Sequence, residues 1–213
     1  MPFLCDQVGS RRRKSAFRKI QPQGPRERSA GDCKGLLLLA LEVASMLNSP
    51  EETTLKSTRQ WQGLWQDVED WHITSTDDVK PIFERPAFHD EDDFPVMCFT
   101  TSMALFATFL YHSLIHMLLA AKPRLVDLGN RTETNTSILY HAKRVCAIAA
   151  GNRESLKWDL FMIPLLESAA RYMTHQHQQQ RVLQAFDFVV ATMGWKVEGV
   201  VNRLTTSWTL GAG

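Results

Sequence analysis

Hydrophobic residues recur at intervals of three and four along most of this chain. Residues with that spacing lie on one face of an α-helix, which has 3.6 residues a turn. The clearest stripe consists of Trp61, Leu64, Trp65, Val68 and Trp71. It predicts a helix from residue 54 to about residue 72. Its tryptophans could line an apolar pocket, but the helical spacing favours filling of a core.

Further segments show the same periodicity, and proline, glycine or polar turns separate them. They are residues 36–47, 96–121, 136–150, a segment that Pro164 starts or bends and that runs to residue 173, 178–193 and 197–208. We expect Gly194 to end the helix before it, and residues 75–95 to form a loop. Apolar and polar residues do not alternate with a period of two over any sustained stretch. The sequence therefore predicts an all-α fold, a multi-helix bundle without a sheet.

Residues 1–34 differ in composition from the rest. They carry nine Lys and Arg against three Asp and Glu, whereas residues 35–213 carry fifteen against twenty. The first segment has almost nothing apolar to bury, so it cannot offset the entropy of ordering and is predicted to be disordered. We expect one helical domain over residues 35–213. Its acidic excess argues against a DNA-coating surface, which needs clustered positive charge.

The basic segment contains one dense cluster of cations. It consists of Arg11, Arg12, Arg13, Lys14, Arg18 and Lys19. Such a run suits a nuclear-import signal, a phosphate-binding tail or a solvated linker, and we rank import first. The cysteines agree with a reducing compartment, because Cys5, Cys33, Cys98 and Cys146 stand far apart and form no Cys-x-x-Cys pair. We expect such isolated thiols to pack as small buried apolar residues.

Residues 94–121 carry no formal charge and are long enough to cross a bilayer. Seven threonine, serine and histidine residues lie within this stretch, and each polar group left unpaired in hydrocarbon costs several kcal/mol. The central helix of a bundle is therefore favoured over a membrane anchor.

His112 and His116 are the one pair with metal-like spacing, because residues four apart share a helix face. No third ligand lies nearby, and the neighbours are apolar, so hydrogen-bonded core histidines are favoured. His175 and His177 are expected in solvent, as is the acidic run at residues 90–93. The chain has no phosphate-binding glycine loop, nucleophile elbow or His-Glu-x-x-His motif.

Several stretches, taken in order, resemble the regulatory (middle homology) region of fungal transcription factors of the binuclear zinc-cluster family. They are WQGLWQDVEDW at 61–71, DFP at 93–95, FLYH at 109–112, KPR at 122–124, HAKRVCAIA at 141–149, IPLLESAA at 163–170, QRVLQ at 180–184 and MGW at 193–195. The resemblance extends over about residues 36–208, which is most of the chain.

The resemblance implies an all-helical, non-enzymatic domain that regulates transcription in the nucleus. Its expected partners are other proteins or a second copy, bound through helical faces, and a small-molecule effector. The family's six-cysteine DNA reader is not among these residues, so we expect no direct DNA binding by this chain, and zinc only with such a module outside it. No other cofactor and no membrane are expected. The alternative is a helical metal-dependent or small-molecule enzyme that uses His112 and His116.

Overall fold

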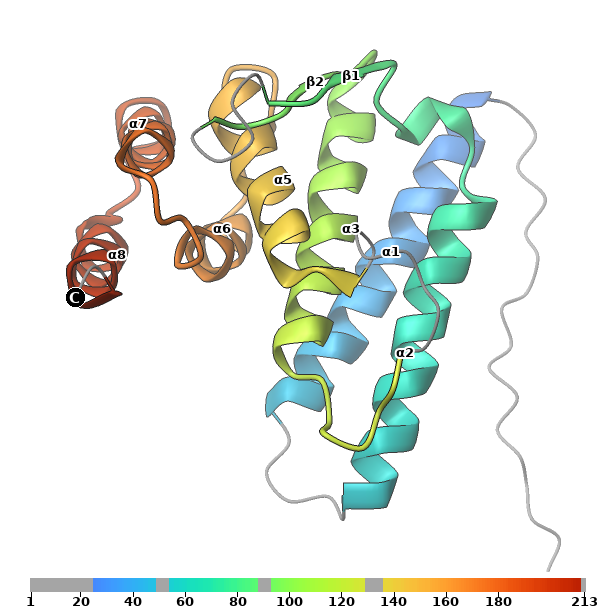
Figure 1. Ribbon diagram of the computed structural model, residues 1–213. Coiled ribbons are helices and arrows are strands. Elements are labelled where there is room, and N and C mark those ends of the chain that lie inside the picture. Colours follow the sequence, from blue (N-terminus) through green and yellow to red (C-terminus); the bar gives the residue numbers. More distant parts are fainter. Residues whose placement is uncertain (1–24, 49–53, 88–92, 129–135, 212–213) are drawn as a thin grey trace, which may run out of the picture.

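The computed structural model describes residues 25–48, 54–87, 93–128 and 136–211 (Figure 1). Within these ranges the chain forms seven α-helices, one short 3-10 helix and a two-stranded sheet. The elements are α1 (Pro25–Asn48), α2 (Thr54–Thr74), η1 (Asp77–Val79), β1 (Phe83–Arg85), β2 (Val96–Cys98), α3 (Ser102–Ala120), α5 (Ile138–Gly151), α6 (Met162–Ala170), α7 (Gln176–Met193) and α8 (Glu198–Gly211). The predicted all-α class is confirmed, and the basic run at residues 11–19 lies outside the described residues.

The first helix begins much earlier than the periodicity predicts. We expected it at residue 36, but α1 starts at Pro25, so residues 25–34 of the segment predicted to be disordered are helical. Proline suits a first helical turn, where its missing N–H would have no partner anyway. Cys33 is buried in a small cluster with Val79 and Ala107. This contact with later segments stabilises a part of the helix that has no apolar stripe of its own.

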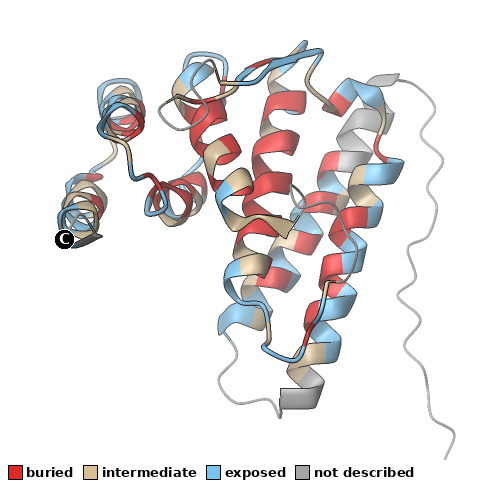
Figure 2. Cartoon of the chain, viewed as in Figure 1, coloured by how far each residue is buried: buried red, intermediate tan, exposed pale blue. Residues whose placement is uncertain are grey.

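Helix α3 is the centre of the molecule. It contacts α1, α2, α5 and α6, and thirteen of its nineteen residues are buried (Figure 2). Among the described residues it is the one helix long and apolar enough to cross a membrane, and 72% of that stretch is buried inside the structure. Core helices pass the same test of length and composition, so the test is weak evidence for a membrane span.

The tryptophan stripe of α2 faces this core, as predicted. Trp61 and Trp65 are almost fully buried, and their rings stack with centroids 5.2 Å apart. The indole Nε1 of Trp61 donates a hydrogen bond to the carbonyl oxygen of Leu118 on α3, at 2.7 Å. Helical spacing thus accounts for both rings as core residues.

The antiparallel pairing of β1 with β2 corrects two predictions. We expected no sheet and a helix from residue 96, yet Val96 pairs with Arg85, and Phe83 with Cys98. Helix α3 begins only at Ser102, because the Thr101 side chain caps it by accepting a hydrogen bond from the Ala104 amide at 3.0 Å. A strand of three residues is too short to show a two-residue period, so the sequence carried no sign of it.

Helices α6, α7 and α8 appear end-on in Figure 1, so they run across the direction of α1, α2, α3 and α5. Glu167 on α6 accepts hydrogen bonds from Arg171 and from Arg203 on α8, at 2.7–2.9 Å. Gly194 ends α7 in the left-handed conformation, with φ at 69°, as predicted. The ends of α2, α5, α6, α7 and α8 lie within three residues of the predicted ends.

Candidate functional site: a histidine and arginine cavity

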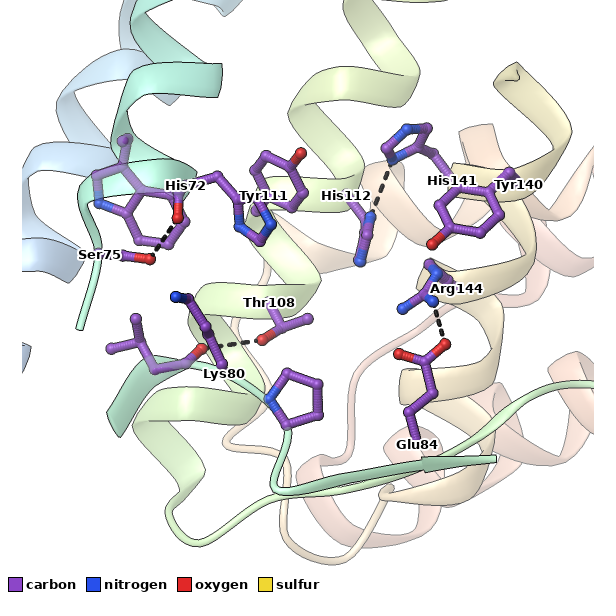
Figure 3. Close-up of a pocket in the computed structure, with 13 residues that line it drawn as sticks. His72, Ser75, Lys80, Glu84, Thr108, Tyr111, His112, Tyr140, His141 and Arg144 are labelled. Carbon is purple, nitrogen blue, oxygen red and sulfur yellow. Dashed lines mark hydrogen bonds and ion pairs between the residues drawn. The ribbon is translucent and has the colours of Figure 1, made fainter. Parts of the chain in front are cut away.

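A cavity of about 300 Å³ lies between α2, α3, α5 and the segment from η1 to β1 (Figure 3). Its lining is rich in aromatic and ionisable side chains. The lining residues are Trp71, His72, Ser75, Val79, Lys80, Pro81, Glu84, Thr108, Tyr111, His112, Tyr140, His141 and Arg144. We name this space the His112 cavity.

Helices α3 and α5 supply six of the lining side chains, and helical spacing places the three from each helix on one face. Thr108, Tyr111 and His112 lie at intervals of three and four on α3, so all of them face the same way. Tyr140, His141 and Arg144 do so on α5. The Thr108 hydroxyl lies 3.1 Å from the carbonyl oxygen of Val79, which holds η1 against α3.

A histidine pair forms the inner wall of the cavity. The Nδ1 atoms of His112 and His141 are 2.9 Å apart, and both residues are buried. One Nδ1 must therefore carry a proton and donate it while the other accepts. Burial lowers the pKa of His112 well below its ordinary value, and positive charge on His141, Arg144 and His72 lowers it further. His112 is therefore neutral near pH 7.

Arg144, about one turn further along α5 from His141, is a buried cation. It forms an ion pair with Glu84 of β1, and its guanidinium carbon lies 4.5 Å from the centre of the Tyr140 ring. Figure 3 shows the guanidinium between the Tyr140 hydroxyl and the Glu84 carboxylate. Within the described residues, its buried Nε has no hydrogen-bond partner. Because a buried charge without a counter-charge is costly, Glu84 stabilises Arg144 in this position.

Tyr111 and His72 form the third side. Their rings stack with centroids 4.1 Å apart, and the Tyr111 hydroxyl donates to Glu69 at 3.1 Å. Burial raises the pKa of Tyr111, and the Glu69 carboxylate raises it further, so the phenol remains a donor. Burial lowers the pKa of His72, and the positive charges of Lys80 and Arg144 lower it further. Among the described lining residues, Arg144 and Lys80 are cations and Glu84 is a carboxylate, so cations outnumber carboxylates while His72 and His112 are neutral near pH 7.

The structure separates the two histidines that the sequence paired. His112 lines the cavity, whereas the Nε2 of His116 lies 3.3 Å from the Ser168 hydroxyl, and its ring meets Tyr172 edge-on. Both histidines are buried and hydrogen-bonded, which agrees with the interpretation as core residues. Among the described residues, no group of three or more His, Cys, Asp or Glu side chains could hold a metal ion.

The other candidate residues lie away from the cavity. His177 is exposed, with its Nδ1 4.0 Å from Asp93. Asp93 also forms an ion pair with Arg181 at 2.8 Å, while residues 90–92 lie outside the described ranges. Cys33 and Cys146 are buried, as expected of small apolar residues, and burial raises the pKa of Cys146. Cys98 is exposed on β2, contrary to the expectation of buried thiols.

No sequence pattern identified His141, Arg144 and Glu84 as site residues. A signal was present for two of them, since His141 and Arg144 interrupt an otherwise apolar helix face next to Val145 and Cys146. A charged residue in such a stripe indicates a buried partner or a polar cavity. Glu84 had no comparable signal, because its role depends on a pairing across 60 residues.

Comparison with protein-family models, curated proteins and solved structures finds no match for this chain. The resemblance to the fungal zinc-cluster regulatory region therefore stays a prediction from its sequence motifs.

Proposed function

We propose that this chain is a helical domain that regulates transcription in response to a small molecule bound in the His112 cavity. The observation that carries the proposal is the cavity itself, in which buried imidazole, phenol and guanidinium groups surround about 300 Å³. Ligand pockets of this size typically combine apolar walls with a few convergent polar groups. The ordered motifs that resemble fungal regulatory domains supply the link to transcription.

Energetics support a binding role. Buried ionic and polar groups seldom stabilise a fold more than well-packed apolar residues of equal volume would. Here Arg144, His112 and His141 are all at most 9% exposed, yet they surround a space instead of packing tightly together. Ionisable groups with perturbed pKa values that cluster in a cavity are typical of functional sites.

The position of the cavity suits regulation. Its lining comes from α2, α3, α5 and β1, so an occupant would contact four elements that are distant in the sequence. A ligand shifts a conformational equilibrium only through contacts that differ between the two states. A ligand in a site shared by four elements can make such contacts. It can thereby change the helical surfaces that bind partner proteins or a second copy.

A tethering assay tests this proposal. The full chain, fused to an unrelated DNA-binding module, is expected to change the output of a reporter that carries the module's target sites. His112→Phe is expected to alter that output, because it removes a polar group from the cavity. His116→Phe is the matched control, since His116 is buried one turn further along α3 but does not line the cavity. Output equal to that of the module alone, or equal effects of both variants, would overturn the proposal.

Nuclear import through the basic run is a separate part of the proposal. A fluorescent fusion of the full chain is expected in the nucleus, and deletion of residues 11–19 is expected to release it to the cytoplasm. Because residues 11–19 carry six of the chain's 24 basic residues, replacing those six with glutamine is the matched test of charge. A deletion variant that stays fully nuclear would refute import by this run.

A second candidate is an enzyme that uses His112. The observation that favours it is the contact with His141, because paired imidazoles beside a phenol can transfer protons. A metal-dependent form predicts stoichiometric metal in the purified protein and its loss in His112→Ala. A metal-free form predicts product formation that His112→Phe abolishes and His116→Phe retains. Reporter regulation without turnover would favour the first proposal.

A further inference from the structure

The ion pair between Glu84 and Arg144 joins a weakly held strand to a firmly held helix. Arg144 lies on α5 with its side chain only 11% exposed, whereas the Glu84 side chain is 34% exposed. All three residues of β1 are exposed. Glu84 enters the cavity from this surface strand, so its carboxylate can leave without disturbing the core.

We propose that the ligand of the His112 cavity is a small organic carboxylate that replaces Glu84 at Arg144 and so releases strand β1 from α5, while β2 stays anchored through the buried Met97. The inference rests on the proposed function, because it names the ligand class of that same site. In the empty cavity, Glu84 takes the position of the ligand's carboxylate. Glu84 binds Arg144 through Nη2. A guanidinium can bind a carboxylate through two parallel hydrogen bonds, which an incoming carboxylate can form.

The charges of the lining select the ligand class. Among the described lining residues, Arg144 and Lys80 are cations and Glu84 is the one carboxylate. Lys80 binds Asp77 at 3.2 Å, but that carboxylate is almost fully exposed and outside the lining, so it screens Lys80 weakly. Once Glu84 leaves, the cavity has a net positive charge. A carboxylate restores the balance, whereas a neutral or cationic occupant leaves Arg144 without a counter-charge.

The walls set the shape of the occupant. Trp71, Tyr111 and Tyr140 supply flat aromatic surfaces, and the Arg144 guanidinium lies over the last of these rings. The volume of about 300 Å³ is at the small end of ligand pockets. A molecule with one ring and one carboxylate fits both features, and the neutral rings of His72 and His112 offer N–H donors to further oxygen atoms.

The ligand affinity of Glu84→Gln distinguishes a carboxylate that competes with the ligand from one that only holds Arg144 in place. If Glu84 competes with the ligand, Glu84→Gln weakens the competitor and raises ligand affinity. If Glu84 only holds Arg144 in place, the same variant leaves the affinity unchanged or lowers it. An increase cannot result from partial unfolding, which reduces binding.

The test uses the full chain with benzoate as probe and benzamide as its neutral counterpart, measured by titration calorimetry. Wild type is expected to bind benzoate in preference to benzamide. Glu84→Gln is expected to tighten benzoate binding by about tenfold, the effect of about 1.4 kcal/mol, and Arg144→Gln to abolish the preference. Glu154→Gln, at an exposed position after α5, is the control and is expected to match wild type.

Hydrogen exchange measures the release of β1 on the same samples. The Ile82 amide, just before β1, donates to the carbonyl oxygen of Cys98 on β2 at 2.9 Å, so its exchange reports whether the β1 segment stays paired with β2. Benzoate is expected to speed exchange at Ile82 in wild type, and Ile82 of Glu84→Gln is expected to exchange fast without benzoate. Slower exchange with benzoate would overturn the release of β1.

Three binding results would overturn the carboxylate proposal. They are equal binding of benzoate and benzamide, weaker benzoate binding by Glu84→Gln, and no benzoate binding by either protein. The proposed function fails separately, through the reporter comparison of His112→Phe with His116→Phe. A regulated reporter together with any of these binding results would reject the ligand class and retain the function.

Discussion

The buried histidine pair makes the stability of this protein depend on pH in a predictable direction. His112 is 6% exposed, and its pKa lies well below the ordinary value for histidine. The unfolded chain therefore binds a proton at His112 near pH 6.5, while the folded chain does not. Protonation favours the unfolded state, so the free energy of unfolding falls as pH drops below about 6.5.

The size of the effect follows from proton linkage. With an ordinary pKa of about 6.5 and a folded pKa far below, His112 alone removes about 1.3 kcal/mol between pH 7.0 and pH 5.5. That is a measurable part of a typical stability of 5–15 kcal/mol. Burial is the main reason that the folded-state pKa of His112 is low, and the positive charge of Arg144 lowers it further. His72 and His116, whose pKa values are also lowered, add to the total slope.

The assay is urea unfolding at half-unit steps between pH 5.0 and 7.5, followed by tryptophan fluorescence. His112→Asn removes the titrating ring but retains a hydrogen-bonding group where Nδ1 stood. Between pH 7.0 and 5.5 the variant is expected to lose about 1.3 kcal/mol less of its free energy of unfolding than wild type loses, whatever its absolute stability. His177→Asn is the matched control, because the His177 side chain is 58% exposed, and it is expected to leave the slope unchanged.

Two results would refute the reasoning. A wild-type stability that is constant between pH 7.0 and 5.5 would mean that no buried histidine resists protonation. Equal slopes in wild type and His112→Asn would mean that His112 is already protonated, or is solvated, in the folded protein. Either result would contradict a neutral, buried His112 in the folded protein.

Three further predictions concern stability and are checked by urea unfolding at pH 7. Trp61→Ala is expected to cost about 3–5 kcal/mol, because it removes a buried ring and leaves the Leu118 carbonyl without its donor. Thr101→Ala is expected to cost about 1 kcal/mol through loss of the α3 cap, and Thr101→Ser to cost less. Gly194→Ala is expected to destabilise the fold by about 1–2 kcal/mol, because Gly194 has a positive φ. Gly63→Ala is expected to stabilise it by about 0.5–1 kcal/mol, because Gly63 lies within a helix and its φ is not positive. Neither added Cβ meets another atom within 4 Å, so the backbone alone sets the sign. Reversed signs for the two glycines would contradict the backbone argument.

Most of the helical framework was predictable because its signals are local. The stripe from Trp61 to Val68 has the helical period in the sequence, and those residues are buried in the structure. The end of α7 at Gly194 follows from the freedom of glycine to adopt a positive φ. Such features depend on residues within a few positions of one another, so one sequence suffices to identify them.

The early start of α1 and the β1–β2 pairing were not predictable in the same way. Cys33 holds the upstream part of α1 through contacts with Val79 and Ala107, which are 46 or more residues away in the chain. Each strand has only three residues, and its hydrogen bonds come from the other strand. Both features are therefore stabilised by contacts between residues that are distant in the sequence.

The sequence by itself determined an all-helical chain, the apolar faces of most of its helices and the candidacy of His112. Only the tertiary structure decided that His112 contacts His141 and that His116 contacts Ser168 instead. It also decided that Glu84 binds Arg144, which lies 60 residues further along the chain. The physical reason is that helical periodicity arises from bonds within one turn. The partner of a buried polar group depends on which helix faces pack together when the whole chain folds.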